Sequence, residues 1–180
     1  MNAAWKEQID SVLARDNPQA LLHLARPRTA RVLRYLTGRL CSTNEEEKWW
    51  AAWGLGVLVG DRQLVSQEQA TDLLRRFFWT LNDESGAVPW GVPEAIGEIL
   101  AVRPKLREAF LPMLCSLLTD EDMRQTGAIE RGVIWALGRV GPPVARRAPD
   151  AVEALRVASE THPDCGSREV AARSLASVLK

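Results

Sequence analysis

Apolar side chains recur along most of this chain every three to four residues, the spacing that gathers them on one face of a helix. No segment shows the sustained period-two alternation of a strand, so we expect no β-sheet. The pattern therefore predicts an all-α protein. Two helices are expected within 3–25, the second starting at Pro18, and others over about 27–40, 45–60, 67–81, 93–102, 104–119, 128–140, 148–160 and 167–179.

Local signals mark several helix ends. Residues 42–44 (STN) supply N-cap candidates, and the acidic run 45–47 behind them is typical of a first helical turn. The turn-rich segment 82–93 ends at Pro93, which fits the first turn of the following helix. The sequence GPP at 141–143 predicts that a helix stops there.

Four segments share one pattern: a small residue, an aliphatic residue, Gly or Ala, any residue, and an aliphatic residue. Their third positions are Gly56, Gly97, Gly138 and Ala176, which are 41, 41 and 38 residues apart, a period typical of helix-pair repeats. We therefore predict a single domain over 1–180, an α–α superhelix of about four helix pairs behind an N-terminal helical cap. The expected boundaries are 1–26 for the cap and about 27–60, 66–102, 104–140 and 147–180 for the repeats.

The second helix of each repeat has two distinct faces when about 100° is turned per residue. One face is apolar in all four repeats and predicts the core: Ala51, Leu55, Leu58, Val92, Ile96, Ile99, Val133, Leu137, Val140, Ala171, Leu175 and Val178. The small residues flank it, where neighbouring helices approach closely. The opposite stripe is aromatic and charged: Trp49, Trp53, Val57, Trp90, Glu94, Glu98, Arg131, Trp135, Arg139, Glu169, Arg173 and Ser177. Because second helices usually line the concave side of such arrays, this stripe predicts a solvent-facing groove.

The middle of this groove supplies the candidate partner-binding residues: Trp90, Glu94, Glu98, Arg131, Trp135 and Arg139. Trp is the side chain that most often anchors interfaces. A structural alternative stays open, because Glu94 and Glu98 repel each other at this spacing and Arg131 and Arg139 could pair with them as a surface ladder. The helix dipole would stabilise Glu94 in its first turn without any function. Trp49, Trp50 and Trp53 could likewise pack beneath the N-terminal cap.

The segments ERGVIWALGRVG (130–141) and REVAARSLASVL (168–179) resemble HEAT-like repeats of the phycobilisome-lyase type, a resemblance that extends over about 27–179. It implies an armadillo-type superhelix used mainly for protein binding. Fold alone does not assign function. The expected function is a non-enzymatic scaffold that binds a protein or peptide in its groove. Chromophore or cofactor lyase activity rests on the family name alone.

A second function class remains open. HEAT-like arrays include DNA glycosylases for alkylated bases, which are similar in combining Trp platforms with an acid. The chain has no overall basic charge, with 23 Lys and Arg against 23 Asp and Glu, so nucleic-acid binding needs a local patch. Residues 1–40 contain seven basic and three acidic residues. Within them Arg28, Arg31 and Arg34 are the candidates for contacting nucleic acid.

The residues give little support for disulfides, metal sites, nucleotide-binding motifs or a catalytic nucleophile. Cys41, Cys115 and Cys165 are odd in number and widely spaced, which argues against disulfides and thiolate metal sites and fits a reducing compartment. His23 and His162 are far apart, and no P-loop, dinucleotide fingerprint or nucleophile elbow occurs. We therefore expect no cofactor, no metal and no catalytic residue. The chain shows neither an export signal nor an apolar run long enough to span a membrane, which predicts a cytoplasmic protein.

Overall fold

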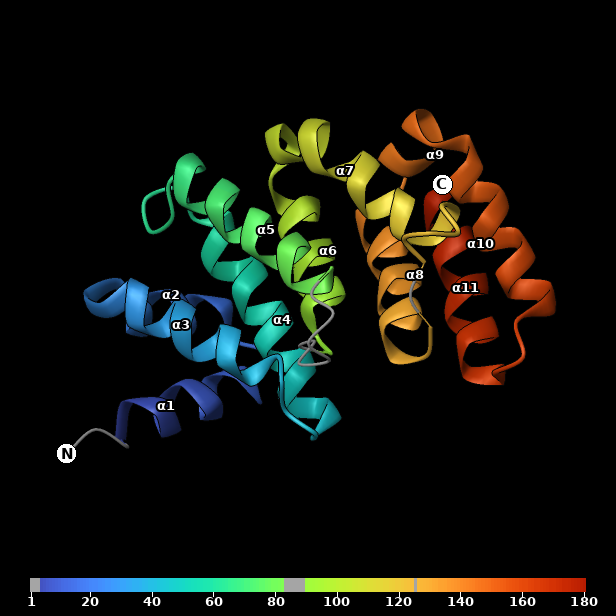
Figure 1. Cartoon of the computed structure of the whole chain (residues 1–180). Coiled ribbons are helices and arrows are strands. Elements are labelled where there is room, and N and C mark those ends of the chain that lie inside the picture. The colour runs from blue at the N-terminus through green and yellow to red at the C-terminus, as the bar shows by residue number, and fades with distance from the viewer. Residues whose placement is uncertain (1–3, 83–89, 125) are drawn as a thin grey trace.

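The computed structural model describes residues 4–82, 90–124 and 126–180, and within them all regular structure is helical (Figure 1). The all-α prediction is confirmed. The elements are α1 (Ala4–Leu13), α2 (Pro18–Ala25), the 3-10 turn η1 (Arg26–Arg28), α3 (Thr29–Arg39), α4 (Glu45–Gly60), α5 (Gln67–Leu81), α6 (Val92–Val102), α7 (Pro104–Thr119), α8 (Ala128–Val140), α9 (Pro143–Arg147), α10 (Pro149–Thr161) and α11 (Cys165–Val178).

The helices form two layers that run from one end of the molecule to the other. Helices α4, α6, α8 and α11 pack side by side in chain order and form what we call the inner layer. Helices α5, α7 and α10 cover the other side of this layer, while α1, α2 and α3 pack against α4 at its free edge. The α1 end and the α11 end lie on opposite sides of the array in Figure 1. This is the predicted α–α superhelix with an N-terminal helical cap.

Helix starts follow the local signals. Asn44 caps α4 through its side-chain oxygen, which accepts hydrogen bonds from the backbone N–H groups of Glu46 and Glu47 at 2.9 and 3.3 Å. Pro93 lies in the first turn of α6, as expected. Helix α11 begins at Cys165, two residues earlier than expected, because the Asp164 carboxylate accepts from the backbone N–H of Ser167 at 2.7 Å. Residues 83–89 of the turn-rich segment lie outside the described part of the chain.

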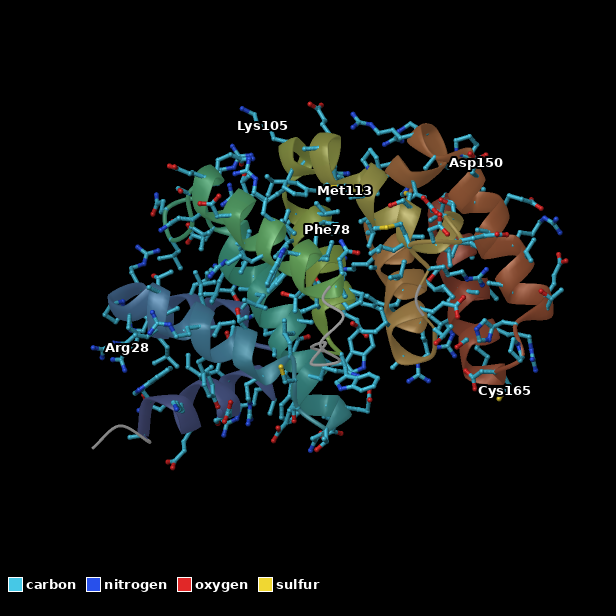
Figure 2. All side chains as sticks on the ribbon, in the orientation of Figure 1. Arg28, Phe78, Lys105, Met113, Asp150 and Cys165 are labelled. Carbon is cyan, nitrogen blue, oxygen red and sulfur yellow. The ribbon has the colours of Figure 1, made fainter. Side chains whose placement is uncertain are left out.

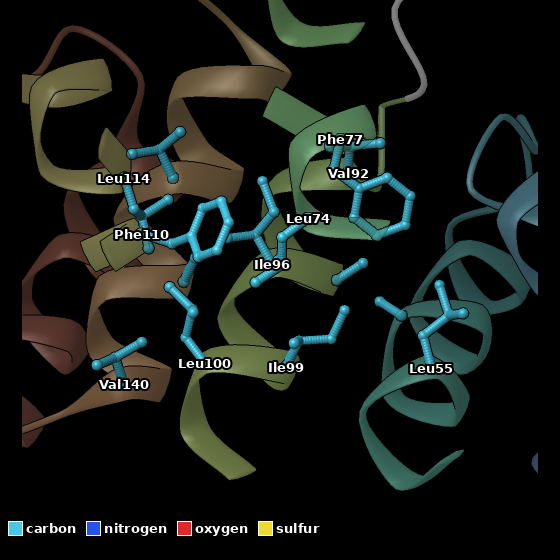
Figure 3. Packing of buried hydrophobic residues seen from close by; sticks show 14 of the residues in the cluster. Leu55, Leu74, Phe77, Val92, Ile96, Ile99, Leu100, Phe110, Leu114 and Val140 are labelled. Atoms are coloured by element: carbon cyan, nitrogen blue, oxygen red, sulfur yellow. The ribbon is translucent and has the colours of Figure 1, made fainter. Parts of the chain in front are cut away.

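The core stripe was predicted correctly. Eleven of its twelve positions are buried, and Leu55, Ile96 and Ile99 have no exposed surface (Figure 3). Leu175 is partly exposed because α11 is the last helix and has no further inner helix beside it. Phe110 and Leu114 of α7 reach the same core from the outer layer. The free energy of this burial, roughly 25 cal/mol per Å² of apolar surface, is the main force that holds the layers together.

The small repeat positions lie where inner helices touch. A Cβ atom added to Gly97 would lie 2.7 Å from the Cα of Ala136, and one added to Gly138 would lie 2.6 Å from the Cα of Ser174. A Cβ on Gly56 would lie 2.8 Å from the Cβ of Glu98. These distances are shorter than real carbon contacts, so only glycine permits this approach. The expected close packing of neighbouring helices is confirmed at these three glycines, whereas Ala176 of the last repeat is exposed.

Two features were not anticipated. The GPP segment ends α8 as predicted, but the chain then forms the short helix α9, whose Val144 is fully buried. Arg103, directly after α6, is only 2% exposed. Its guanidinium donates hydrogen bonds to the backbone carbonyl oxygens of Val59, at 2.6 Å, and Val65. It thereby joins the end of α4 to the segment that leads into α5.

Candidate functional site

The two candidate glutamates lie between helices rather than in solvent. Glu94 is 5% exposed and Glu98 is 7% exposed, whereas Trp90 is 51% exposed. The expectation that the glutamates face an open groove is therefore wrong. Its cause is the close approach of the inner helices, since Glu98 packs on Gly56 of α4 and Glu94 packs on Gly132 of α8. A helical wheel gives the direction of a side chain but not the distance to the next helix.

Glu98 is satisfied within the protein. Its Oε1 lies 3.0 Å from Nε of Arg139 on α8, so the predicted ion pair between neighbouring inner helices is present at this position. Burial raises the pKa of Glu98, and the hydrogen bond and charge of Arg139 act against that rise. Glu98 and Arg139 therefore behave as a structural pair, which was the alternative interpretation of these two residues.

Glu94 differs from Glu98 although it lies one turn away on the same helix. Its Oε2 is buried and has no hydrogen-bond partner within the described residues. Burial raises the pKa of Glu94 to about 7, while its own backbone N–H, Lys48 and Arg131 act in the opposite direction. The predicted ion pair with Arg131 does not form at contact distance among the residues described. A buried carboxylate with an unsatisfied oxygen is costly and calls for an explanation.

Glu94 lines a cavity of about 310 Å³ to which all four inner helices contribute. Trp49 and Trp135 form part of its wall and meet edge to face, with ring centroids 4.7 Å apart and ring planes at 71°. Trp50 and Trp53 are partly buried and pack against the core, whereas Trp49 faces this cavity. The other charged groups on the cavity wall are Glu45, Lys48, Arg131 and Glu169.

The structure brings together three of the six candidate positions, Glu94, Arg131 and Trp135, in this one cavity. Arg139 and Trp135 line a neighbouring cavity of about 250 Å³, bounded by α8 and α11. Trp90 lines neither of them. The backbone next to it is fixed, since the N–H of Gly91 donates to the carbonyl oxygen of Leu40 at 3.0 Å.

Sequence reasoning missed Lys48 as a member of the site. It is 4% exposed, its stem lies against Gly91, and its Nζ lies 2.8 Å from Oε2 of Glu45. Trp49 and Glu169 were visible in the aligned stripe, but not their place beside Glu94. Gly91 is the residue that could have indicated Lys48. A glycine before the start of a helix leaves space in which the aliphatic part of a lysine from a neighbouring helix can pack.

The basic candidates Arg28, Arg31 and Arg34 lie elsewhere, on η1 and α3 at the start of the first predicted repeat. Arg31 and Arg34 line a cleft of about 440 Å³ together with Trp5 and Tyr35. Lys6 lies over the Tyr35 ring, with its Nζ 5.3 Å from the ring centroid. Arg28 does not line this cleft. Arg28, at the end of η1, and Cys165, at the start of α11, lie on opposite sides of the molecule in Figure 2.

The described residues hold neither a cluster that could bind a metal ion nor a helix that could cross a membrane. In the ranges 4–82, 90–124 and 126–180, no three His, Cys, Asp or Glu side chains gather in a way that could hold a metal ion. No helix in the same ranges combines the length and apolar character needed to cross a membrane.

Comparison with known proteins supports the fold. A designed armadillo repeat protein in complex with the peptide (KR)4 superimposes with a TM-score of 0.54 at 16% identity, over 96% of this chain and 86% of that one. A second engineered protein gives a TM-score of 0.52 at 20% identity, over 91% of this chain and 72% of that one. The fold is an armadillo-like array of helical repeats. Identities this low show the fold alone.

Sequence comparison adds one relative. An uncharacterized protein of Archaeoglobus fulgidus is 36% identical over 92 residues, which make up 51% of this chain and 48% of that protein. The match therefore spans only about half the length of the relative. No protein-family model matches the chain. The phycobilisome-lyase type of repeat thus stays a prediction from the sequence.

Proposed function

We propose that this protein is a non-enzymatic binding scaffold that holds a peptide or protein segment on the exposed side of its inner layer. The observation that carries the proposal is the cavity of about 310 Å³ between α4, α6, α8 and α11, with Trp49 and Trp135 in its wall. A cavity of this size is at the small end of ligand-binding pockets, which suits a single side chain better than a cofactor.

Two further observations support peptide binding, and a third concerns the compartment. Trp supplies large rigid contact area and dominates binding energy at many interfaces. The designed armadillo repeat protein of similar fold was solved with a bound peptide, which makes peptide binding by this array a reasonable analogy. All three cysteines are free, which fits the reducing cytoplasm.

The decisive experiment is selection of a random peptide library on the immobilised full chain. Trp135→Ala should abolish enrichment of the peptides that the wild type selects. Trp79→Ala is the matched control, because Trp79 is 73% exposed and lies on α5 outside the inner layer. If Trp135→Ala selects the same peptides with equal enrichment, the peptides do not bind on this side of the inner layer.

The cleft between α1 and α3 favours a second candidate function, the binding of nucleic acid. Arg31 and Arg34 converge there beside the rings of Trp5 and Tyr35, and cations with aromatic platforms suit a phosphate backbone with stacked bases. Binding to a short DNA duplex should weaken steeply with salt and should be lost in Arg34→Glu. Arg146→Glu, at an exposed position of α9, is the control. Absence of any mobility shift at low salt would exclude this function.

A further inference from the structure

The Glu94 carboxylate is the least satisfied polar group on the inner layer. Its Oε2 is buried, has no hydrogen-bond partner among the described residues, and belongs to a side chain that lines a cavity. Glu98, one turn later on the same helix, is also buried but is paired with Arg139 of α8. The interface between α6 and α8 can therefore supply an ion-pair partner to a buried carboxylate. The Oε2 atom of Glu94 has no such partner among the described residues.

The charged groups around Glu94 do not replace this partner. On α4, Lys48 is held by Glu45 through its Nζ, 2.8 and 2.9 Å from the two carboxylate oxygens, so their charges offset each other. On α11, Glu169 lies 3.4 Å from Arg173, an exposed pair that contributes little. On α8, Arg131 attracts Glu94 without contacting it.

The cavity wall adds the second requirement of a cation site. Indole rings attract cations to their faces, and the aliphatic stems of Lys and Arg pack well against them. Trp49 and Trp135 provide such rings beside the carboxylate. An anionic ligand would gain from Arg131, but it would place its charge next to Glu94 and Glu169 in the same small space.

Resting on the proposed function, we infer that the Glu94 cavity receives the side-chain cation of a Lys or Arg in the bound segment, with its stem against the Trp49 and Trp135 pair that forms part of the wall. The ammonium or guanidinium group pairs with the Glu94 carboxylate, which lines the cavity and has an oxygen without a hydrogen-bond partner among the described residues. Charge-assisted bonds of this kind, formed away from water, are among the stronger contacts in binding sites. The site thus selects basic segments over neutral and acidic ones.

Proton linkage gives this inference a signature in the wild-type protein. Only the ionised carboxylate attracts a cation, and without a ligand Glu94 has its pKa raised to about 7. Glu45 and Lys48 of α4, Arg131 of α8 and Glu169 of α11 face it, and Glu98 lies on its own helix. Affinity for a basic peptide should therefore rise between about pH 6 and pH 8, with release of a proton on binding.

The test is calorimetric titration of the full chain with three end-blocked octapeptides: (KR)4, an alternating norleucine–citrulline analogue of the same length, and (DE)4. Glu94→Gln should weaken (KR)4 binding by at least about tenfold and remove both the pH dependence and the proton release. Glu68→Gln is the matched control, since Glu68 is an exposed first-turn acid of α5 and should change nothing. Nα-acetyl-lysine amide carries a single lysine side chain without the rest of a peptide. It tests whether the side chain alone is enough for binding, and it should bind far more weakly than (KR)4.

Failure of this inference differs from failure of the proposed function. If peptides bind in a manner that depends on Trp135 but Glu94→Gln leaves (KR)4 affinity unchanged, the scaffold stands and the cation site is wrong. Preference for (DE)4 would overturn it as well. If no octapeptide binds and library selection is also empty, the proposed function itself fails. The pH dependence of (KR)4 binding is measured on the wild type and needs no variant. The inference can therefore be tested even if Glu94→Gln misfolds, and a wild-type affinity that does not change with pH would contradict it.

Discussion

Trp49 of α4 and Trp135 of α8 contact each other edge to face, with ring centroids 4.7 Å apart, although α6 lies between their helices in the inner layer. Two side chains can meet across an intervening helix only if both reach over its surface. The pair therefore spans α6, beside the start of the helix where Glu94 lies. It links the first and third predicted repeats directly, in addition to the stacking of neighbours.

This aromatic contact should be measurable in the free energy of unfolding. Edge-to-face pairs contribute about 0.5–1.5 kcal/mol beyond the area they bury. A double-mutant cycle of Trp49→Ala and Trp135→Ala in urea denaturation should give a coupling of that size. The pair Trp49→Ala and Trp79→Ala, whose rings belong to different layers, should be additive within about 0.5 kcal/mol. Additivity in both cycles would show that the contact adds nothing to stability.

Gly97→Ala should destabilise the protein even though Ala is the better helix former. The new Cβ would lie 2.7 Å from the Cα of Ala136, so α6 and α8 would have to separate, at a cost of about 1–3 kcal/mol. Gly38→Ala in α3 is the matched control, because nothing lies within 4 Å of its Cβ position. That substitution should stabilise by up to about 1 kcal/mol. Thermal or urea unfolding of the two variants checks the opposite signs.

The stability of the wild type should fall as pH rises through the titration of Glu94. Burial raises the folded-state pKa of Glu94 from 4.5 to about 7, so the folded state holds a proton that the unfolded chain releases. The corresponding stabilisation is full below about pH 4.5 and is lost by about pH 7, a change on the order of 2–3 kcal/mol. Urea unfolding across this range should show a smaller decline in Glu94→Gln, which cannot ionise. Parallel curves for the two proteins would contradict the raised pKa.

Arg103→Met should be among the most destabilising changes to a charged residue. It would leave the backbone carbonyl oxygens of Val59 and Val65 without their buried donor, at a cost of about 2–4 kcal/mol. Arg75→Met on exposed α5 removes only a surface pair with Asp72 and should cost less than about 1 kcal/mol. Denaturant unfolding of both variants distinguishes the cases, and equal midpoints would show that Arg103 is not a structural link.

Most of the fold could be predicted because its determinants are local or periodic. Helix starts such as Asn44 and Pro93 depend on groups within a few residues, and the apolar stripe through Leu55, Ile96 and Leu137 repeats with the helix. The short helix α9 was missed, since a proline pair predicts a stop but not the brief helix that follows it.

The site could be predicted only in part. Glu94, Arg131 and Trp135 were identified from their shared stripe, but their separation from Glu98 and Arg139 into a cavity and an ion pair was not. Burial statistics offered packing beneath the N-terminal cap as an alternative for Trp49, whereas its ring contacts Trp135, which lies 86 residues later in the chain. Contacts between residues so far apart in the sequence depend on how successive helices tilt against one another. The spacing of residues within one helix does not determine that tilt.

The sequence by itself determined the helices, their repeat and the side that each turns to the core, because backbone geometry fixes the angle of every side chain about its own axis. Only the tertiary structure decided which residues of the opposite stripe meet water. Gly56 and Gly132 let the inner helices approach so closely that Glu98 and Glu94 are buried between them. One of these carboxylates then finds an arginine on the next helix, and the other faces a cavity without a partner.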